Sequence, residues 1–164
     1  MPSRRSLLAA GGAATAGALA GCTFPNRVDG YVQLKAVQVV RTVEGRRNVA
    51  DVVSVRLSDP AGADDPELHR LHDEWADRFL RPRYPTVDDA LHADLTAAYE
   101  AVRYIVGVCS PGWADDDRDV GCYNAGAPRR DFNRAQVHDR VRASRTRDGV
   151  RVHGVDGDWA FEDE

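Results

Sequence analysis

Lysine is almost absent from this chain. Of its 22 basic residues, 21 are arginine and Lys35 is the single lysine. Glutamate is scarce as well, with 6 residues against 20 aspartates. Three cysteines in 164 residues exclude a small disulfide-dense scaffold. The chain has no strongly apolar run of about 18 residues or more, which argues against a conventional membrane-spanning helix.

Several sequence motifs of enzymes and nucleotide-binding proteins are also missing. The glycine-rich phosphate cradles G-x-G-x-x-G and G-x-x-x-x-G-K-[ST] do not occur, nor do G-x-S-x-G, S-x-x-K and H-E-x-x-H. We therefore assign no catalytic and no cofactor-binding residue, expect no cofactor, and find no specific support for an enzyme.

The first 21 residues have the layout of an export signal. Arg4 and Arg5 are followed by Leu7 and Leu8, then by a mild stretch of alanine and glycine up to Gly21. This arrangement resembles a twin-arginine (Tat) translocation signal, which implies the Tat machinery as a partner.

Leu19-Ala20-Gly21-Cys22 resembles the lipobox of secreted lipoproteins. The resemblance implies cleavage before Cys22 and a lipid on its thiol, and a lipid with two chains is enough for stable anchoring. The alternatives are a plain cleaved signal and an uncleaved N-terminal anchor. We expect a cell-membrane lipoprotein on the extracellular face, in contact with the membrane through the lipid on Cys22.

The charge composition has two possible explanations. The bias toward aspartate and away from lysine resembles proteins of halophilic archaea, whose surfaces stay hydrated when salt screens charge. A GC-rich genome is the alternative. Without Arg4 and Arg5, 20 basic residues face 26 acids, a net charge of −6, which argues against a nucleic-acid partner. The chain thus resembles a Tat-exported lipoprotein of halophilic archaea, while its mature domain resembles no family that we can name.

We divide the chain into a signal peptide (1–21), a lipid-anchored tether (22–30), a single domain (31–155) and an acidic C-terminal end (156–164). The two cysteines other than Cys22 are Cys109 and Cys122, and an even count outside the cytoplasm predicts a disulfide between them. A reactive thiol pair and a metal site are the alternatives, although neither spacing nor a neighbouring histidine favours them.

The hydrophobic pattern predicts an α+β fold. Strands are expected at 31–43 and 49–57, and again at 141–147 and 150–155, as two antiparallel hairpins in one small sheet. Leu68, Leu71, Trp75 and Phe79 have helical spacing between Pro66 and Pro82. A second amphipathic helix is expected from Thr86 to Val106, and a short one at 131–138. The segment 110–130 is predicted to be an irregular loop closed by the disulfide.

Three groups of residues are candidate sites. Asp115, Asp117 and Asp119 alternate as the ligands of a cation can, but the EF-hand pattern fails and a hydrated acidic loop is the alternative.

His69 and His72 have the spacing of zinc ligands on one helix face. Trp113 and Tyr123 are either exposed anchors for a partner or rings folded back onto the sheet.

The expected function is that of a binding or structural module, whose unknown extracellular partner is a ligand or a protein. The alternative is a secreted hydrolase or metal-dependent enzyme that uses the loop between Ser110 and Arg130.

Overall fold

The computed structural model describes residues 27–59, 61 and 65–161. Arg4, Arg5 and Cys22 lie outside these residues, as do residues 162–164 of the acidic end. None of the described helices has both the length and the apolar character needed to cross a membrane.

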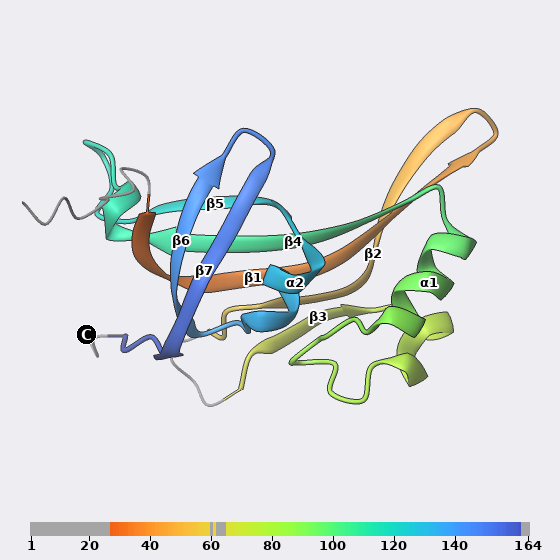
Figure 1. The fold of residues 1–164 in the computed structure, drawn as a ribbon, viewed down its shortest axis with the longest axis horizontal. Helices are drawn as coiled ribbons and strands as arrows, with labels where there is room; N and C mark the ends of the chain where they lie inside the picture. The colour runs from red at the N-terminus through yellow and green to blue at the C-terminus, as the bar shows by residue number, and fades with distance from the viewer. Residues whose placement is uncertain (1–26, 60, 62–64, 162–164) are drawn as a thin grey trace, which may run out of the picture.

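The described residues form a seven-stranded antiparallel sheet, in which five strands follow the spatial order β3-β2-β1-β4-β5 (Figure 1). The strands are β1 (Arg27–Val43), β2 (Arg46–Arg56), β3 (Glu67–Leu71), β4 (Ala101–Ser110), β5 (Gly121–Ala127), β6 (Asp139–Thr146) and β7 (Gly149–Asp158).

Strand β1 is the organising element because it pairs with three other strands. Its central part pairs with β4, its second half with β2, and Arg27–Tyr31 with β6. Residues 27–30, expected in the tether, are therefore part of the sheet. The β6–β7 hairpin crosses in front of β1 and β4, with α2 (Arg129–Arg134) beside it (Figure 1).

The predicted fold class is wrong. The two predicted hairpins are present, but the protein is mostly antiparallel sheet with short helices, rather than two hairpins flanked by two amphipathic helices. The helical segments other than α2 are η1 (Asp73–Arg78), α1 (Asp89–Ala98) and η2 (Pro111–Trp113).

The first predicted helix fails at β3. Leu68 pairs with Val55 and Leu71 pairs with Val53, while a bulge leaves His69 without a register partner. An inserted residue moves two side chains three positions apart onto the same face of a strand. The helical spacing of the leucines is thus the signature of a bulged strand.

The second predicted helix stops early, because α1 ends at Ala98 and Tyr99 is already extended. The residues that follow form β4, whose core face carries Val102, Tyr104, Val106 and Val108 in alternation. Val102 and Val106 fit both a helix and a strand, but the β-branched run and pairing with β1 on one side and β5 on the other favour the strand.

The hydrophobic core lies on one face of the sheet, beneath the helices and the β6–β7 hairpin. Val37 and Val106 from the central strands meet Leu95 of α1 and Phe132 of α2, all of them fully buried. Val141 of β6 belongs to the same cluster. This packing fixes the helices and their connections against β1, which is the basis of the site described below.

Candidate functional site

The predicted cation ligands lie in a tight turn between η2 and β5. Asp115 bonds to Arg118 at 2.7 Å between Oδ2 and Nη2, and its Oδ1 also accepts the backbone N–H of Asp117. The bond from Arg118 lowers the pKa of the Asp115 carboxyl group. Among the described residues, no group of three or more histidine, cysteine or acidic side chains is placed to hold a metal ion.

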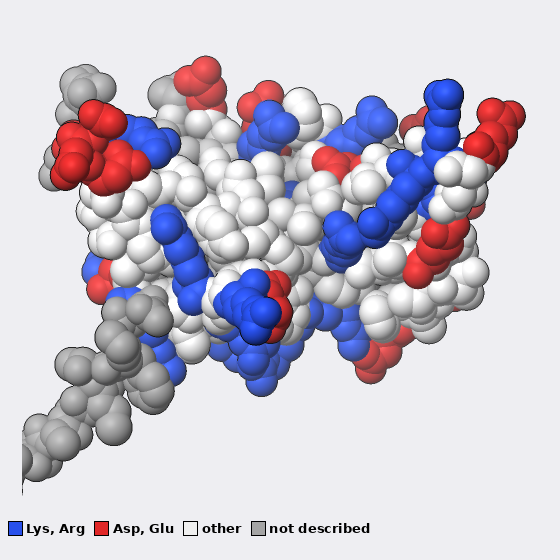
Figure 2. Space-filling model, turned by 90° about the horizontal axis from the view of Figure 1, so that it is seen from above, with Lys and Arg blue, Asp and Glu red and all other residues white. Residues whose placement is uncertain are grey.

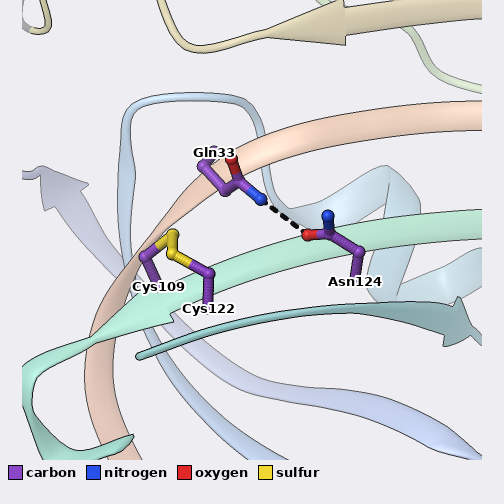
Figure 3. The surroundings of a disulfide bond; sticks show 4 residues. All are labelled: Gln33, Cys109, Cys122 and Asn124. Atoms are coloured by element: carbon purple, nitrogen blue, oxygen red, sulfur yellow. Dashed lines mark hydrogen bonds between the residues drawn. A yellow bond between two sulfur atoms is a disulfide. The ribbon is translucent and has the colours of Figure 1, made fainter. Parts of the chain in front are cut away.

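The predicted disulfide between Cys109 and Cys122 is confirmed. It joins directly paired residues of β4 and β5, with Cys109 2% exposed and Cys122 at the surface (Figure 3). Gln33 donates to Asn124 at 2.6 Å beside it. The segment 110–130 is not the predicted long loop, because most of its second half forms β5 and the start of α2.

Trp113 and Tyr123 are folded back onto the protein. Both are partly buried against the core, with their ring centroids 6.5 Å apart. Arg145 of β6 covers them, with its guanidinium carbon 4.3 Å from the Trp113 centroid. Such a stacked cation stabilises the aromatic pair and occupies the ring faces that a partner would use.

The histidines are spread over the molecule. His69 and His72 lie at the β3 bulge and at the cap of η1, rather than on one helix face. His92, His138 and His153 each contact one hydroxyl group, from Tyr104, Ser58 and Ser144 respectively. Within the described part of the chain, no carboxylate bonds to any of these rings, so the protein shows no hydroxyl–histidine–acid relay there.

Lys35, the single lysine of the chain, is the most unusual residue of the structure. It lies on the core face of β1 and is 0% exposed. Its Nζ donates to the carbonyl oxygen of Pro85 at 2.8 Å and to Oε1 of Gln136 at 2.9 Å, and lies 4.1 Å from the Phe132 ring centroid. No described carboxylate is within ion-pair distance of it, so the groups in direct contact with its charge are two oxygen dipoles and an aromatic ring.

Burial gives Lys35 an unusual titration. Removal from water lowers its pKa to about 7, against a partial opposing effect of the Asp139 carboxylate. Burial also raises the pKa of Asp139, whose Oδ2 accepts the backbone N–H of Gln136 at 2.6 Å. A lysine that is half protonated near neutral pH is typical of functional sites.

The groups that receive the Lys35 bonds are themselves held firmly. Next to Pro85, Val87 exchanges two hydrogen bonds of 2.8 Å with the Asn133 amide, one in each direction. Arg129 adds a bond to the Val87 carbonyl oxygen. The link between η1 and α1 is therefore fastened to both α2 and β1.

A cavity of about 370 Å³ is lined in part by Gln136. We call it the Gln136 cavity, and the residues on which its chemistry depends are Arg78, Phe79, Arg81, Thr86, Leu91 and Gln136. A larger cavity of about 550 Å³ lies between β4–β5 and the tip of the β6–β7 hairpin. Both cavities are lined by charges of both signs, but of the two it is the Gln136 cavity whose lining includes a residue bonded to the buried Lys35.

Acidic and basic side chains are mixed on the face of the molecule shown in Figure 2. Figure 2 shows a cluster of acidic side chains at the left end of the visible face, with further acidic and basic side chains interspersed along it. On that face, no broad patch of one sign runs across the molecule.

This site is not among the candidate sites predicted from the sequence. The available signal is the position of Lys35 between Leu34 and Ala36 within a valine-rich strand. Comparisons of the chain with protein-family models, curated proteins and solved structures found no match. Functional conclusions therefore depend on the residues themselves.

Proposed function

We propose that this protein is a lipid-anchored module of the outer face of the cell membrane that binds a small ligand in the Gln136 cavity. The observation that carries the proposal is the motif Leu19-Ala20-Gly21-Cys22, which ends five residues before β1 begins at Arg27. In this proposal the Tat machinery recognises Arg4 and Arg5 and exports the domain, and the lipid on Cys22 retains it at the surface.

The disulfide supports a location outside the cytoplasm. Disulfides persist in oxidising compartments and are rare where thiols are kept reduced. The Cys109–Cys122 bond closes the turn between β4 and β5, which holds few buried side chains. The extracellular location thus suits both the signal sequence and the chemistry of the domain.

The Gln136 cavity supports a binding role. Its volume is within the range of small-molecule sites, Gln136 of its lining bonds to Lys35, and the lining residue Thr86 lies between Pro85 and Val87, which are both held by hydrogen bonds. Preformed walls reduce the entropy that a ligand loses on binding. We assign binding rather than catalysis because the described histidines contact hydroxyl groups without a carboxylate behind them.

Substitution of Cys22 by serine tests the anchor. Cells that produce the wild-type protein should hold it in the membrane fraction, and mass spectrometry of its N-terminus should find Cys22 as the first residue with a lipid attached. Cys22→Ser should release the protein into the medium. Continued membrane retention of Cys22→Ser would contradict the anchor.

The export route has a separate test. Arg4→Lys combined with Arg5→Lys should trap the precursor in the cytoplasm, because Tat signals depend on the arginine pair. The matched control is Arg27→Lys, which changes an arginine outside the signal. Unimpaired export of the double variant would indicate a general secretory signal instead.

A further inference from the structure

We infer that the Gln136 cavity binds a small carboxylate that carries an apolar group, and that Lys35 positions the amide that recognises it. The inference rests on the proposed function, because it names the ligand class of the binding site proposed above. It does not depend on the lipid anchor.

Lys35 determines which part of Gln136 meets the ligand. A lysine ammonium has donors and no acceptor, so the Gln136 oxygen has to face Nζ, as it does at 2.9 Å. The amide NH₂ group is then the part of Gln136 that is left to donate. No described residue accepts a hydrogen bond from it, and Gln136 lines the cavity. Gln136 is partly exposed, so this NH₂ group is open to water and is free to donate to an acceptor of a ligand that displaces the water.

The charges around the cavity favour an anion. Arg81 stacks on Tyr84 with its guanidinium carbon 4.8 Å from the ring centroid, and makes no ion pair with any described residue. Arg78 shares its charge with Asp94 at 2.5 Å. The acid of the lining, Asp88, keeps its negative charge but directs Oδ1 to the start of α1, where it accepts the backbone N–H of Leu91 at 2.7 Å, and the two arginines of the lining outnumber it. Planar guanidinium groups match the two oxygens of a carboxylate.

The apolar part of the lining favours an anion that carries an apolar group. Phe79 and Leu91 line the cavity as nearly buried core residues, whereas Leu80 is 95% exposed beside them. A simple anion would leave the Leu80 side chain in contact with water. An acid with a short apolar chain can cover Leu80 and bring its carboxylate to the arginines and the Gln136 amide.

Lys35 itself does not touch the ligand in this arrangement. It is a positioning residue whose positive charge has no described carboxylate partner, and a bound carboxylate would supply negative charge one side chain away. Asp139 at the start of β6 is the charged group that acts on it. Lys35 also contacts Pro85 in the η1–α1 link and Phe132 in α2, and neither of these residues titrates.

The test uses the full chain carrying Cys22→Ser, so that no lipid is present, with hexanoate and its neutral isostere hexanamide as probes in calorimetry. Hexanoate should bind at least tenfold more tightly than hexanamide. Arg81→Ala and Gln136→Leu should each weaken hexanoate at least tenfold, whereas Arg147→Ala on the β6–β7 turn should leave its affinity unchanged. N-acetyl-leucine resembles the C-terminus of a peptide, whereas hexanoate resembles a free acid. Tighter binding of N-acetyl-leucine would indicate a peptide terminus as the ligand, and tighter binding of hexanoate would indicate a free acid.

The role of Lys35 has its own readout. Hexanoate stays ionised between pH 6 and pH 8, so a rise in its affinity toward pH 6 should follow protonation of Lys35 and disappear in Lys35→Met. Should Lys35→Met fail to fold, Gln136→Leu is the second variant, because it keeps the lysine and removes the amide through which Lys35 positions the ligand, so the pH dependence should weaken. A pH dependence that stays unchanged in the variant that folds would overturn the positioning role.

Two further results would overturn the inference at different levels. Equal affinity for hexanoate and hexanamide would refute the ligand class while leaving the cavity a binding site. No binding of hexanoate, hexanamide or N-acetyl-leucine at millimolar concentrations would refute binding in the cavity altogether. Neither result bears on the anchor, which membrane fractionation of the Cys22→Ser protein decides independently.

Discussion

Burial of Lys35 makes the stability of this protein depend on pH in a direction that can be calculated. At pH 6 the lysine is protonated in both the folded and the unfolded chain. At pH 9 the unfolded chain still holds this proton, with a pKa near 10.5, whereas the folded protein, with a pKa of about 7, has lost it. Because the unfolded state binds more protons between these values, stability rises with pH across that window.

The size of this effect follows from the separation of the two pKa values. Each pH unit in the window is worth about 1.4 kcal/mol, so the free energy of unfolding gains about 3 kcal/mol from Lys35 between pH 6 and pH 9. Lys35→Met keeps the length of the side chain and cannot titrate. It also leaves the Pro85 oxygen and the Gln136 oxygen without a donor, which costs about 1–3 kcal/mol for each.

Urea unfolding of both proteins at pH 6 and pH 9, with the disulfide intact, measures this difference. Lys35→Met should be less stable than wild type at both pH values, because two acceptors lose their donor, and the difference should be about 3 kcal/mol larger at pH 9 than at pH 6. Histidines titrate in both proteins, so their contribution cancels in the comparison. A difference between the two proteins that stays constant from pH 6 to pH 9 would refute the reasoning, because it would mean that Lys35 titrates alike in the folded and unfolded chains.

Three other predictions concern stability. Replacing Cys109 and Cys122 together by alanine should lower the free energy of unfolding by about 3 kcal/mol, measured by urea unfolding, because the bond closes a short loop; an unchanged midpoint would contradict this. Gly149→Ala should lower the free energy of unfolding by more than about 2 kcal/mol, because Gly149 has a φ of +144° and an added Cβ would lie 1.9 Å from the Gly126 carbonyl oxygen. Thermal melting measures the loss. The control is Gly45→Ala, where no atom lies within 4 Å of the added Cβ and only the backbone cost applies. Leu95→Ala should cost about 2–5 kcal/mol because Leu95 is fully buried, and Leu80→Ala should change stability little because Leu80 is exposed.

The hairpins were predictable because their signals are local. Glu44 and Gly45 adopt positive φ at the β1–β2 turn, and Gly149 does so after the β6–β7 turn, where the sequence has turn residues between apolar runs. The disulfide was predictable by counting, once Cys22 is assigned to a lipid. These features need no knowledge of distant contacts.

The helices were overpredicted because a spacing of three or four residues has two physical origins. In β3 the bulge at His69 produces it, and the bulge is stabilised by pairing with β2, which the periodicity of a single segment does not encode. The Lys35 site was missed for a related reason. Pro85 and Gln136 stand 50 and 101 residues from Lys35, and only the folded sheet brings them together.

The central place of β1 also has a mechanical consequence for the anchored protein that we propose. Any pull on Cys22 is transmitted to the first residue of this strand, and β4 and β6 both bond to it in antiparallel register. Force along such a strand loads many hydrogen bonds together instead of opening them one at a time, and β4 passes part of the load covalently to β5 through Cys109. Single molecules pulled from residue 22 should therefore unfold at a higher force than molecules pulled from the C-terminal side, where β7 is peeled away first. Equal unfolding forces in the two experiments would contradict this. The strand that carries the buried Lys35 would then also be the strand that bears tension from the membrane.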